Sequence, residues 1–241
     1  MTKRSKILIL GGSSDIGIET TKLFLKNNWE VISHYSKKNS VLDSLVKKEK
    51  LLTSFKFDLR NINEFQKHII KKKNLFLNLD AFVSLTGYLV PAKFENFKIK
   101  EFYNHINVNF LSNILATRSI LKGMMKRKNG RIVLTSSIGT KFGGGDSTFL
   151  YSLSKFNNQF FPSYYKKQAY EKNITINTLQ IGLTATKIHK KLKSKNFKNR
   201  IKMIPLKRMA KVSEVSNYIL KLCSKDNTLL TNSVINISGG E

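Results

Sequence analysis

The sequence predicts an α/β protein built around one doubly wound, parallel β-sheet. Short apolar runs of strand length alternate with longer stretches whose apolar residues recur at helical spacing, from one end of the chain to the other. The first apolar run leads through a glycine-rich turn into a helix, as in a β-α-β unit. We find no internal repeat and no linker, so we expect a single domain over residues 1–241.

The same periodicities place the individual elements. The predicted strands are 6–10, 30–33, 53–57, 80–85, 131–135, 174–179 and 233–237. The predicted helices are 18–27, 41–50, 62–72, 102–125, 151–170 and 214–224. Pro162 falls inside the helix predicted for 151–170, and its missing N–H should kink that helix.

The composition is strongly basic, because 43 Lys and Arg residues against 15 Asp and Glu residues give a net charge of +28. Such a charge is typical of proteins that bind nucleic acid or anionic membranes. The lysines are scattered along the whole chain, however, and this favours a compositional origin. A nucleic-acid partner is therefore not expected, although both explanations of the charge stay open.

Other bulk features indicate a cytoplasmic protein. No apolar run is long enough to span a membrane, and the run at 7–10 is too short for the apolar core of a signal peptide. The single cysteine, Cys223, excludes an intramolecular disulfide and a cysteine metal cluster. The four histidines show no ligand spacing, so we expect no metal site.

Residues 11–17, Gly-Gly-Ser-Ser-Asp-Ile-Gly, form the glycine-rich turn after the first predicted strand. A turn of this kind brings backbone N–H groups and a helix N-terminus to a pyrophosphate. Gly11 allows the sharp turn, and Gly17 allows the helix to pack closely on the strand. Glycine-rich turns are common, so this motif alone is modest evidence for a dinucleotide site.

The end of the second predicted strand is where a dinucleotide-binding fold reads the adenosine ribose. An acidic residue there would select a free 2′-hydroxyl, but the chain continues as Tyr35-Ser36-Lys37-Lys38. Ser36 and the two lysines suit a 2′-phosphate, which favours NADP(H) and leaves NAD(H) as the alternative cofactor. A solvated basic loop is the other explanation of these residues.

Tyr151 and Lys155 lie four residues apart, so on a helix they share one face. An ammonium group beside a phenol favours the phenolate and should lower the tyrosine pKa from about 10 towards neutrality. Such a tyrosine can pass a proton to or from a substrate oxygen, which the Ser137 hydroxyl could hold. Taken alone, the pair is more typical of an ordinary surface helix.

The order of these motifs resembles that of the short-chain dehydrogenase/reductase family in its compact single-domain form, over nearly the whole chain. The turn at 11–17 resembles the family's Gly-x-x-x-Gly-x-Gly, with Asp15 replacing the middle glycine. Ser137, Tyr151 and Lys155 match the catalytic serine and the Tyr-x-x-x-Lys motif, and Asn109 matches the catalytic asparagine. The resemblance implies a Rossmann fold and hydride transfer between a nicotinamide and a carbonyl or alcohol carbon.

Other matches to the family are partial. Residues 84–87, Ser-Leu-Thr-Gly, stand where Asn-Asn-Ala-Gly is usual, and Ile181 replaces a proline. Asp58 falls where the family places an aspartate against adenine, and Asp15 is expected to point outward and cap the following helix. By resemblance, the residues that bind the cofactor are Gly11, Ser13, Ser14, Asp15, Ile16, Tyr35, Ser36, Lys37, Asp58, Leu59, Thr86, Gly87, Tyr151, Lys155, Gly182, Thr184 and Thr186.

The implied mechanism gives each catalytic residue one role in reduction. Ser137 bonds the carbonyl oxygen, and Tyr151 donates the proton. Lys155 lowers the Tyr151 pKa and binds the nicotinamide ribose. Asn109 holds a water that links Lys155 to solvent as a proton relay.

The segment after Gly182, which covers the substrate in this family, is dense in Lys and Arg over 187–202. This suggests an anionic substrate handle, with a solvated basic helix as the alternative. We therefore predict an NADP(H)-dependent oxidoreductase of a small-molecule or carrier-linked carbonyl substrate, or, as its first alternative, a 3-oxoacyl-carrier reductase. The alternative from another class is a non-catalytic, nucleotide-sensing or nucleic-acid-binding protein on the same fold.

The stretch 106–121 and the helix after Lys155 are unusually apolar for exposed helices. In this family the equivalent helices pair across a two-fold axis, so the resemblance implies a homodimer or homotetramer. Burial of these helices on their own sheet is the competing explanation.

Overall fold

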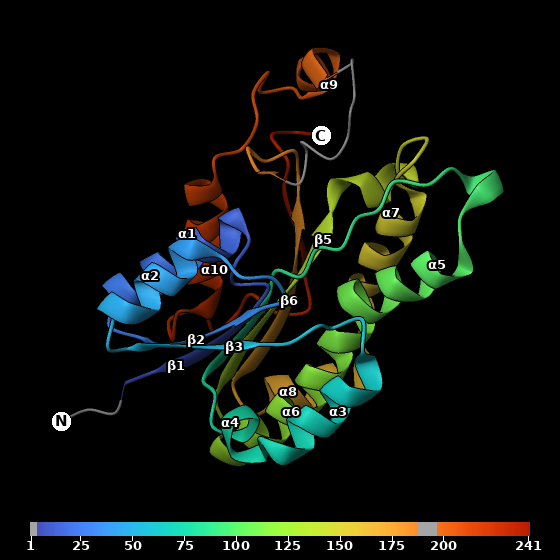
Figure 1. The fold of residues 1–241 in the computed structure, drawn as a ribbon. Coiled ribbons are helices and arrows are strands. Elements are labelled where there is room, and N and C mark those ends of the chain that lie inside the picture. The colour runs from blue at the N-terminus through green and yellow to red at the C-terminus, as the bar shows by residue number, and fades with distance from the viewer. Residues whose placement is uncertain (1–3, 188–196) are drawn as a thin grey trace.

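A computed structural model describes residues 4–187 and 197–241 of the chain. Its centre is a seven-stranded sheet in which every neighbouring pair of strands is parallel, in the order β3-β2-β1-β4-β5-β6-β7. Helices cover both faces of the sheet (Figure 1). The doubly wound α/β fold that the sequence predicts is therefore confirmed, with the strand order reversing between β1 and β4.

The elements follow the predicted alternation closely. The strands are β1 (Lys6–Leu10), β2 (Glu30–Tyr35), β3 (Leu52–Lys56), β4 (Ala81–Ser84), β5 (Gly130–Ser137), β6 (Ile174–Ile181) and β7 (Val234–Ile237). The α-helices are α1 (Asp15–Lys26), α2 (Ser40–Lys48), α3 (Ile62–Lys71), α4 (Lys73–Leu77), α5 (Ile99–Ile106), α6 (Ser112–Arg127), α7 (Phe149–Phe156), α8 (Ser163–Tyr170), α9 (Phe197–Met203) and α10 (Val212–Cys223). The short helical turns are η1 (Phe94–Asn96), η2 (Asn107–Leu111), η3 (Ile138–Phe142) and η4 (Asn157–Gln159).

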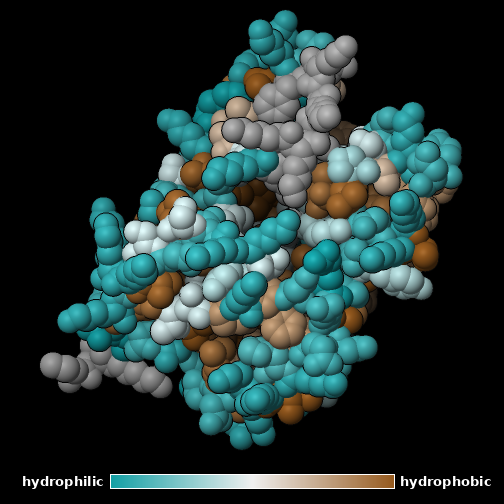
Figure 2. Space-filling view, in the orientation of Figure 1, coloured by the Kyte–Doolittle hydropathy of each residue, from teal (hydrophilic) through white to brown (hydrophobic). Residues whose placement is uncertain are grey.

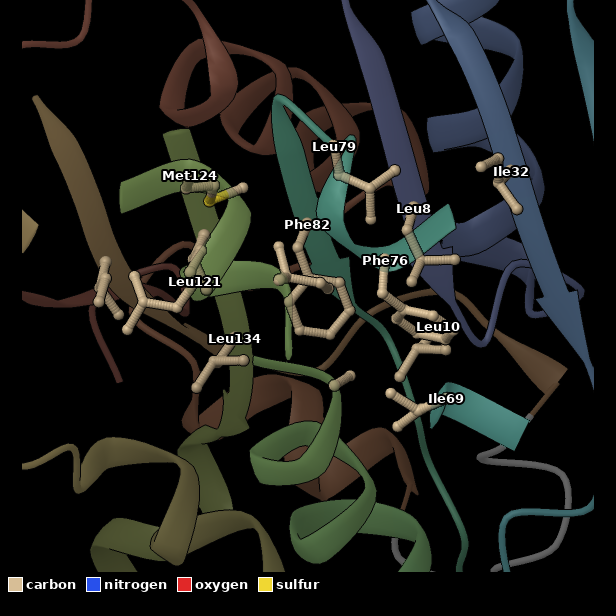
Figure 3. Close-up of a cluster of buried hydrophobic side chains, with 14 of the residues drawn as sticks. Leu8, Leu10, Ile32, Ile69, Phe76, Leu79, Phe82, Leu121, Met124 and Leu134 are labelled. Atoms are coloured by element: carbon tan, nitrogen blue, oxygen red, sulfur yellow. The ribbon is translucent and has the colours of Figure 1, made fainter. Parts of the chain in front are cut away.

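Alternate residues of the central strand β1 point into two separate cores. Leu8 and Leu10 pack on the face that α3, α4, α6 and α8 cover, where Figure 3 shows them beside Phe76. Ile7 and Ile9 pack on the face that α1, α2 and α10 cover. Because the sheet is buried on both faces, its central strands consist of continuous apolar runs, and this is why the sequence locates them well.

The helix predicted for 151–170 is in fact two helices, so the prediction of one kinked helix is wrong. α7 ends at Phe156, η4 follows, and α8 begins directly after Pro162. Proline disfavours the helical conformation in the residue before it, which separates the two helices here. At the N-cap of α8 its missing N–H leaves no intrahelical bond unmade.

The long stretch predicted as one helix at 102–125 is continuous in the structure, but it contains a π-helical turn. α5, η2 and α6 follow one another without a break, and η2 is the π-helical segment. The sequence did not predict the short helix α4, and α9 overlaps the stretch 187–202 for which a solvated basic helix was one of the two explanations. Among the residues that the structure describes, no helix is long and apolar enough to cross a membrane.

Candidate active site

The carboxyl ends of the central strands open into one cavity of about 1410 Å³. Figure 2 shows a hollow near the middle of this face, with apolar side chains visible in its depth. The cavity lies where the strand order reverses, which is the usual ligand site of a doubly wound sheet. The predicted site residues that line it are Ser13, Ser14, Asp15, Ile16, Thr86, Gly87, Ser137, Tyr151, Lys155, Gly182, Thr184 and Thr186.

The other predicted site residues lie outside this wall. Tyr35 ends β2, and Ser36 and Lys37 follow it as exposed residues. Gly11 and Asn109 lie behind the wall, while Asp58 is partly exposed and Leu59 is buried in a core. Asn39 is the residue of the β2–α2 connection that does reach the cavity, and the sequence did not predict it.

Asn39 joins the glycine turn to the start of α2. Its side-chain Nδ2 donates to the Ser13 carbonyl oxygen at 2.9 Å. Its Oδ1 accepts from the backbone N–H groups of Val41 and Leu42, so it is also the N-cap of α2. An asparagine directly before a predicted helix is a capping signal, and that signal could have singled out this residue.

The glycine turn has the geometry that a dinucleotide phosphate needs. Gly11 has a φ of 78°, and a Cβ there would lie 2.6 Å from the Leu85 carbonyl oxygen. A Cβ on Gly17 would lie 2.5 Å from the Gly11 carbonyl oxygen. The N–H groups of Asp15 and Ile16 open α1 at the cavity wall, where no intrahelical acceptor reaches them. The residues present therefore fit a pyrophosphate.

Asp15 does not cap α1, so that expectation is wrong. The N-cap is Ser14, whose Oγ accepts from the Gly17 N–H at 3.0 Å. The Asp15 carboxylate instead accepts from the backbone N–H of Lys187 at 2.6 Å, and the Lys187 Nζ lies 3.9 Å from it. Asp15 thereby joins the glycine turn to the segment that follows β6.

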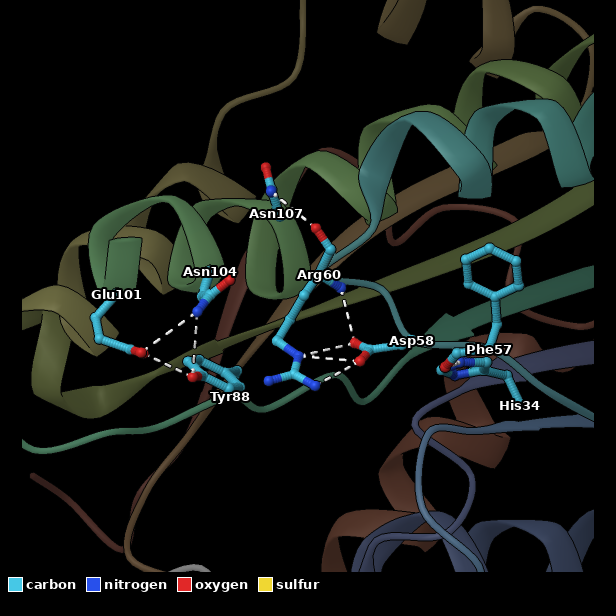
Figure 4. Close-up of polar contacts among 8 residues, drawn as sticks. All are labelled: His34, Phe57, Asp58, Arg60, Tyr88, Glu101, Asn104 and Asn107. Atoms are coloured by element: carbon cyan, nitrogen blue, oxygen red, sulfur yellow. Dashed lines mark hydrogen bonds and ion pairs between the residues drawn. The ribbon is translucent and has the colours of Figure 1, made fainter. Parts of the chain in front are cut away.

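His34 supports the glycine turn from behind, which the sequence did not predict. Its Nδ1 accepts from the Gly11 N–H at 3.2 Å, so its Nε2 donates to the Phe57 carbonyl oxygen at 2.9 Å. Figure 4 shows His34 beneath Phe57. Burial lowers the pKa of His34 to about 4, which keeps the ring neutral and leaves Nδ1 as an acceptor. A histidine directly after the predicted strand 30–33 was the available signal.

Asp58, which the resemblance places against adenine, is bonded to its neighbour Arg60 (Figure 4). Arg60 Nη2 donates to one carboxylate oxygen at 2.6 Å, and Nε donates to both oxygens at 3.0 Å. These hydrogen bonds hold the pKa of Asp58 below its ordinary value. The carboxylate therefore already has a charged partner within the chain.

Ser137 stands at the end of β5, and a polar cluster fixes the backbone there. Its Oγ accepts from the Gly139 N–H at 3.2 Å, and its hydroxyl hydrogen has no acceptor among the described residues. The Thr140 hydroxyl donates to the Ser137 carbonyl oxygen at 2.8 Å and accepts from Gln159 and Gln180 at 3.1 and 2.6 Å. The sequence predicted neither glutamine, because they lie on different elements.

Tyr151 and Lys155 lie on α7, and both line the cavity. Burial raises the pKa of Tyr151 to about 12, so the predicted lowering of this pKa is wrong. Burial also lowers the pKa of Lys155 to about 7, so the ammonium that was expected to attract the phenolate is itself disfavoured. At neutral pH, Tyr151 is therefore a protonated phenol that can donate a proton.

Lys155 is only 2% exposed, and its Nζ is held by the ends of two neighbouring strands. Nζ donates to the Thr86 carbonyl oxygen at 3.1 Å and to the Thr135 Oγ1 at 3.0 Å. The sequence predicted a role for Thr86 but none for Thr135. The hydroxyl of a strand residue two positions before Ser137 carried no recognisable motif.

Asn109 lies in η2 and is fully buried. Its side chain bonds both backbone groups of Tyr88 and the Ser154 hydroxyl, at 2.7 to 2.9 Å. The backbone carbonyl oxygen of Asn109 accepts from the side-chain amides of Asn113 and Asn158 at 2.8 and 2.7 Å. These bonds occupy the side chain and the backbone carbonyl oxygen of Asn109, the groups that could hold a relay water. The relay role of Asn109 stays a prediction.

Comparisons with known proteins agree with this geometry. A family model described as short chain dehydrogenase matches residues 5–196. The 3-oxoacyl-[acyl-carrier-protein] reductase FabG of Thermotoga maritima is 30% identical over 238 residues, which cover 97% of this chain and 96% of that protein. The 3alpha-hydroxysteroid dehydrogenase of Mediterraneibacter gnavus is 24% identical over 244 residues, with coverages of 99% and 97%.

A solved structure, ElxO with NADP bound, has a TM-score of 0.84 and 25% sequence identity, and the match covers 99% of this chain and 98% of that one. The model match and the relatives both span most of the sequence. The structural match agrees with the parallel sheet described above. The chain belongs to the short-chain dehydrogenase/reductase family and is an oxidoreductase enzyme.

Proposed function

We propose that the chain is an NADP(H)-dependent reductase of a 3-oxoacyl thioester attached to an acyl carrier. The observation that carries this proposal is one cavity wall on which Ser137, Tyr151 and Lys155 lie together, in a chain that is 30% identical to a 3-oxoacyl-[acyl-carrier-protein] reductase. Burial raises the pKa of Tyr151 to about 12, so the phenol keeps its proton at neutral pH and can transfer it when the substrate oxygen becomes more basic. A phenol that starts protonated suits the reduction of a carbonyl group.

In this mechanism the bound nicotinamide supplies the hydride. The Ser137 hydroxyl, whose hydrogen has no acceptor within the described residues, donates to the substrate carbonyl oxygen and orients it. Tyr151 then gives its proton to that oxygen. Lys155 uses two of its N–H groups within the protein, and the third is available at the cavity to stabilise the tyrosinate that results.

The lining of the cavity supports an acyl substrate. Apolar side chains that line it include Leu89, Pro91, Phe142, Leu183, Met203 and Pro205. Lys187 and Arg200 also line it, but Lys187 pairs with Asp15 and Arg200 pairs with Glu241. Within the described wall, each of these two cations already lies beside a carboxylate, which makes it less available to an anionic handle. The lysines of 188–196, on which that hypothesis also depended, lie outside the described residues.

Two observations support NADP(H) over NAD(H). Ser36, Lys37 and Lys38 are exposed after β2, where a 2′-phosphate would lie, and no carboxylate stands among them. The related structure ElxO binds NADP. NAD(H) is the alternative that a binding measurement must exclude.

We also propose that the enzyme is a homodimer or homotetramer. Large apolar side chains are exposed along α7 and the start of α8, where they have no cover within the described chain. They are Leu153, Phe156, Phe160 and Tyr164. A second copy of the chain would remove this apolar surface from water.

The first experiment titrates the purified protein with NADPH and with NADH, followed by nucleotide fluorescence. We expect NADPH to bind at least about tenfold more tightly, a difference of about 1.4 kcal/mol. Turnover is then compared for acetoacetyl-CoA, a longer 3-oxoacyl thioester and the phosphorylated ketone dihydroxyacetone phosphate. The proposal predicts faster turnover of the longer thioester and little turnover of the phosphate. Tighter NADH binding would refute the cofactor assignment, and efficient turnover of the phosphate alone would refute the substrate assignment.

A further inference from the structure

We propose that Thr135 is a positioning residue, whose side-chain hydroxyl fixes the buried ammonium group of Lys155 at the floor of the active-site cavity. The inference rests on the proposed role of Lys155 in reduction. It adds a residue that lies two positions before Ser137 on β5 and that no motif marked. Lys155 would touch the reacting groups, and Thr135 would act through Lys155.

The geometry around Nζ leaves few alternatives. An ammonium group has three N–H donors. One goes to the Thr86 carbonyl oxygen at 3.1 Å and one to the Thr135 Oγ1 at 3.0 Å. The third is left for the cavity that Lys155 and Tyr151 both line. The two protein acceptors therefore determine where this third N–H points.

The Thr135 hydroxyl can serve only as an acceptor for Lys155. Its own hydrogen is donated to the Ser84 carbonyl oxygen at 2.7 Å. Thr135 is 3% exposed, so bulk water does not reach the hydroxyl to take the place of Lys155. The next residue, Ser136, donates to the Lys155 carbonyl oxygen at 3.0 Å. Two successive residues of β5 thus hold the backbone and the tip of Lys155.

In the described part of the chain, no carboxylate pairs with the Lys155 ammonium group. Among its salt bridges none includes Lys155, and no hydrogen bond there joins Lys155 to Asn109. The elements packed on α7 are α5, β5, η2, η3 and η4. With Tyr151 on α7 itself, their titratable or charged side chains are Lys100, Glu101, Tyr103, His105, Arg131 and Lys141. None of these bonds Nζ, so the charge of a group that burial disfavours depends on two neutral acceptors.

The test removes the hydroxyl but keeps the shape of the side chain. In Thr135→Val the ammonium loses one acceptor, so Lys155 should lose its proton at lower pH. We expect the high-pH limb of kcat/KM for carbonyl reduction to move down by about one unit, the size of one hydrogen bond to a charged group. Thr135→Ser, which keeps the hydroxyl, should restore the wild-type profile.

Thr175→Val is the matched control. Thr175 lies on the neighbouring strand β6, is 1% exposed, and has no hydrogen-bond partner for its hydroxyl within the described residues. This variant should leave the pH profile unchanged. If Thr135→Val also leaves the profile unchanged, or if both valine variants shift it equally, the positioning role is refuted.

A second measurement does not depend on turnover. The lost acceptor weakens the native protein only where Lys155 is charged. Because the pKa of Lys155 is about 7, the stability deficit of Thr135→Val should be full near pH 5 and should shrink as the pH rises through 7 to about 9. A deficit that stays constant over this range would show a merely structural residue and overturn the proposal. A pH-dependent deficit in a protein that reduces no carbonyl compound would support the contact and refute the proposed function.

Discussion

The charged groups near the proposed dinucleotide site are partly exposed and paired, whereas the titratable groups at the proposed reaction site are buried. Near the glycine turn and after β3, the partly exposed carboxylates Asp15 and Asp58 each meet a cation, Lys187 or Arg60. On α7, burial shifts the pKa values of Lys155 and Tyr151, and no carboxylate among the described residues pairs with Lys155. Exposed ion pairs contribute little and are screened by salt, whereas burial shifts a pKa by whole units. From this comparison we expect desolvation, and not charged partners, to set the pH dependence of the reaction.

The largest effect is expected from Tyr151→Phe, which removes the proton donor and keeps the ring. Turnover should fall about 10²–10⁴-fold, the usual contribution of a general acid. NADPH affinity should change little, and steady-state kinetics with a fluorescence titration will measure both. Tyr164→Phe, at a tyrosine that is 67% exposed on α8, is the control and should keep full activity. Near-normal turnover of Tyr151→Phe would show that Tyr151 is not the proton donor. The buried groups of α7 would then no longer explain the pH dependence of the reaction.

The second largest effect is expected on stability: Lys155→Met should make the protein more stable. The native state lowers the Lys155 pKa from 10.5 to about 7, so the unfolded chain binds more protons between these values. Wild-type stability should therefore rise with pH across this window, because the buried ammonium is unfavourable below it. Methionine removes that charge and should stabilise the protein at pH 7 by about 1–3 kcal/mol, with loss of activity.

Urea unfolding of Lys155→Met and wild type at pH 7 and pH 10 measures this difference. The advantage of the variant should fall at pH 10, where wild-type Lys155 is neutral in the folded state and the unfolded chain, with a lysine pKa of 10.5, is beginning to lose the same proton. An advantage of equal size at both pH values would mean that packing, and not the buried charge, separates the two proteins.

The smallest effect is expected where charges are paired at the surface. Arg60→Gln breaks the ion pair with Asp58 and should change the free energy of unfolding by less than about 1 kcal/mol. In 0.5 M NaCl the difference should nearly vanish, because salt screens exposed charges. Lys67→Gln, which breaks the exposed pair with Glu64, is the control of similar kind. A loss above about 2 kcal/mol from Arg60→Gln would contradict the contrast between the two regions.

The sequence located the strands well because a parallel sheet covered on both faces consists of apolar runs, and Ile7 to Leu10 are all buried. It failed at 151–170, where α7 ends at Phe156 and Pro162 precedes a second helix instead of bending the first. The spacing of Tyr151 and Lys155 correctly placed both on one face. Spacing does not report burial, however, and the pKa of Tyr151 therefore moves in the direction opposite to the prediction.

Contacts between distant residues were beyond what sequence patterns could predict. Asp15 and Lys187 are 172 positions apart, and their bond depends on how the chain returns over the cavity after β6. His34 meets the Gly11 N–H only because β2 pairs with β1 in one particular register. Thr135 meets Lys155 because α7 packs on the end of β5. Each contact is a product of the fold, whereas motifs describe neighbours along the chain.

The π-helical turn η2 fixes the number of residues that can connect α5 to α6. Such a turn closes its hydrogen bonds over five residues instead of four, so it holds one residue more than an α-helical turn. Each helical residue advances the direction of its side chain by about 100°, a full turn divided by 3.6. Removing one residue from 107–111 would therefore turn α5, with Glu101 and His105, out of phase with α6. Insertions and deletions in related chains should be excluded from this stretch, even where substitutions within it are accepted.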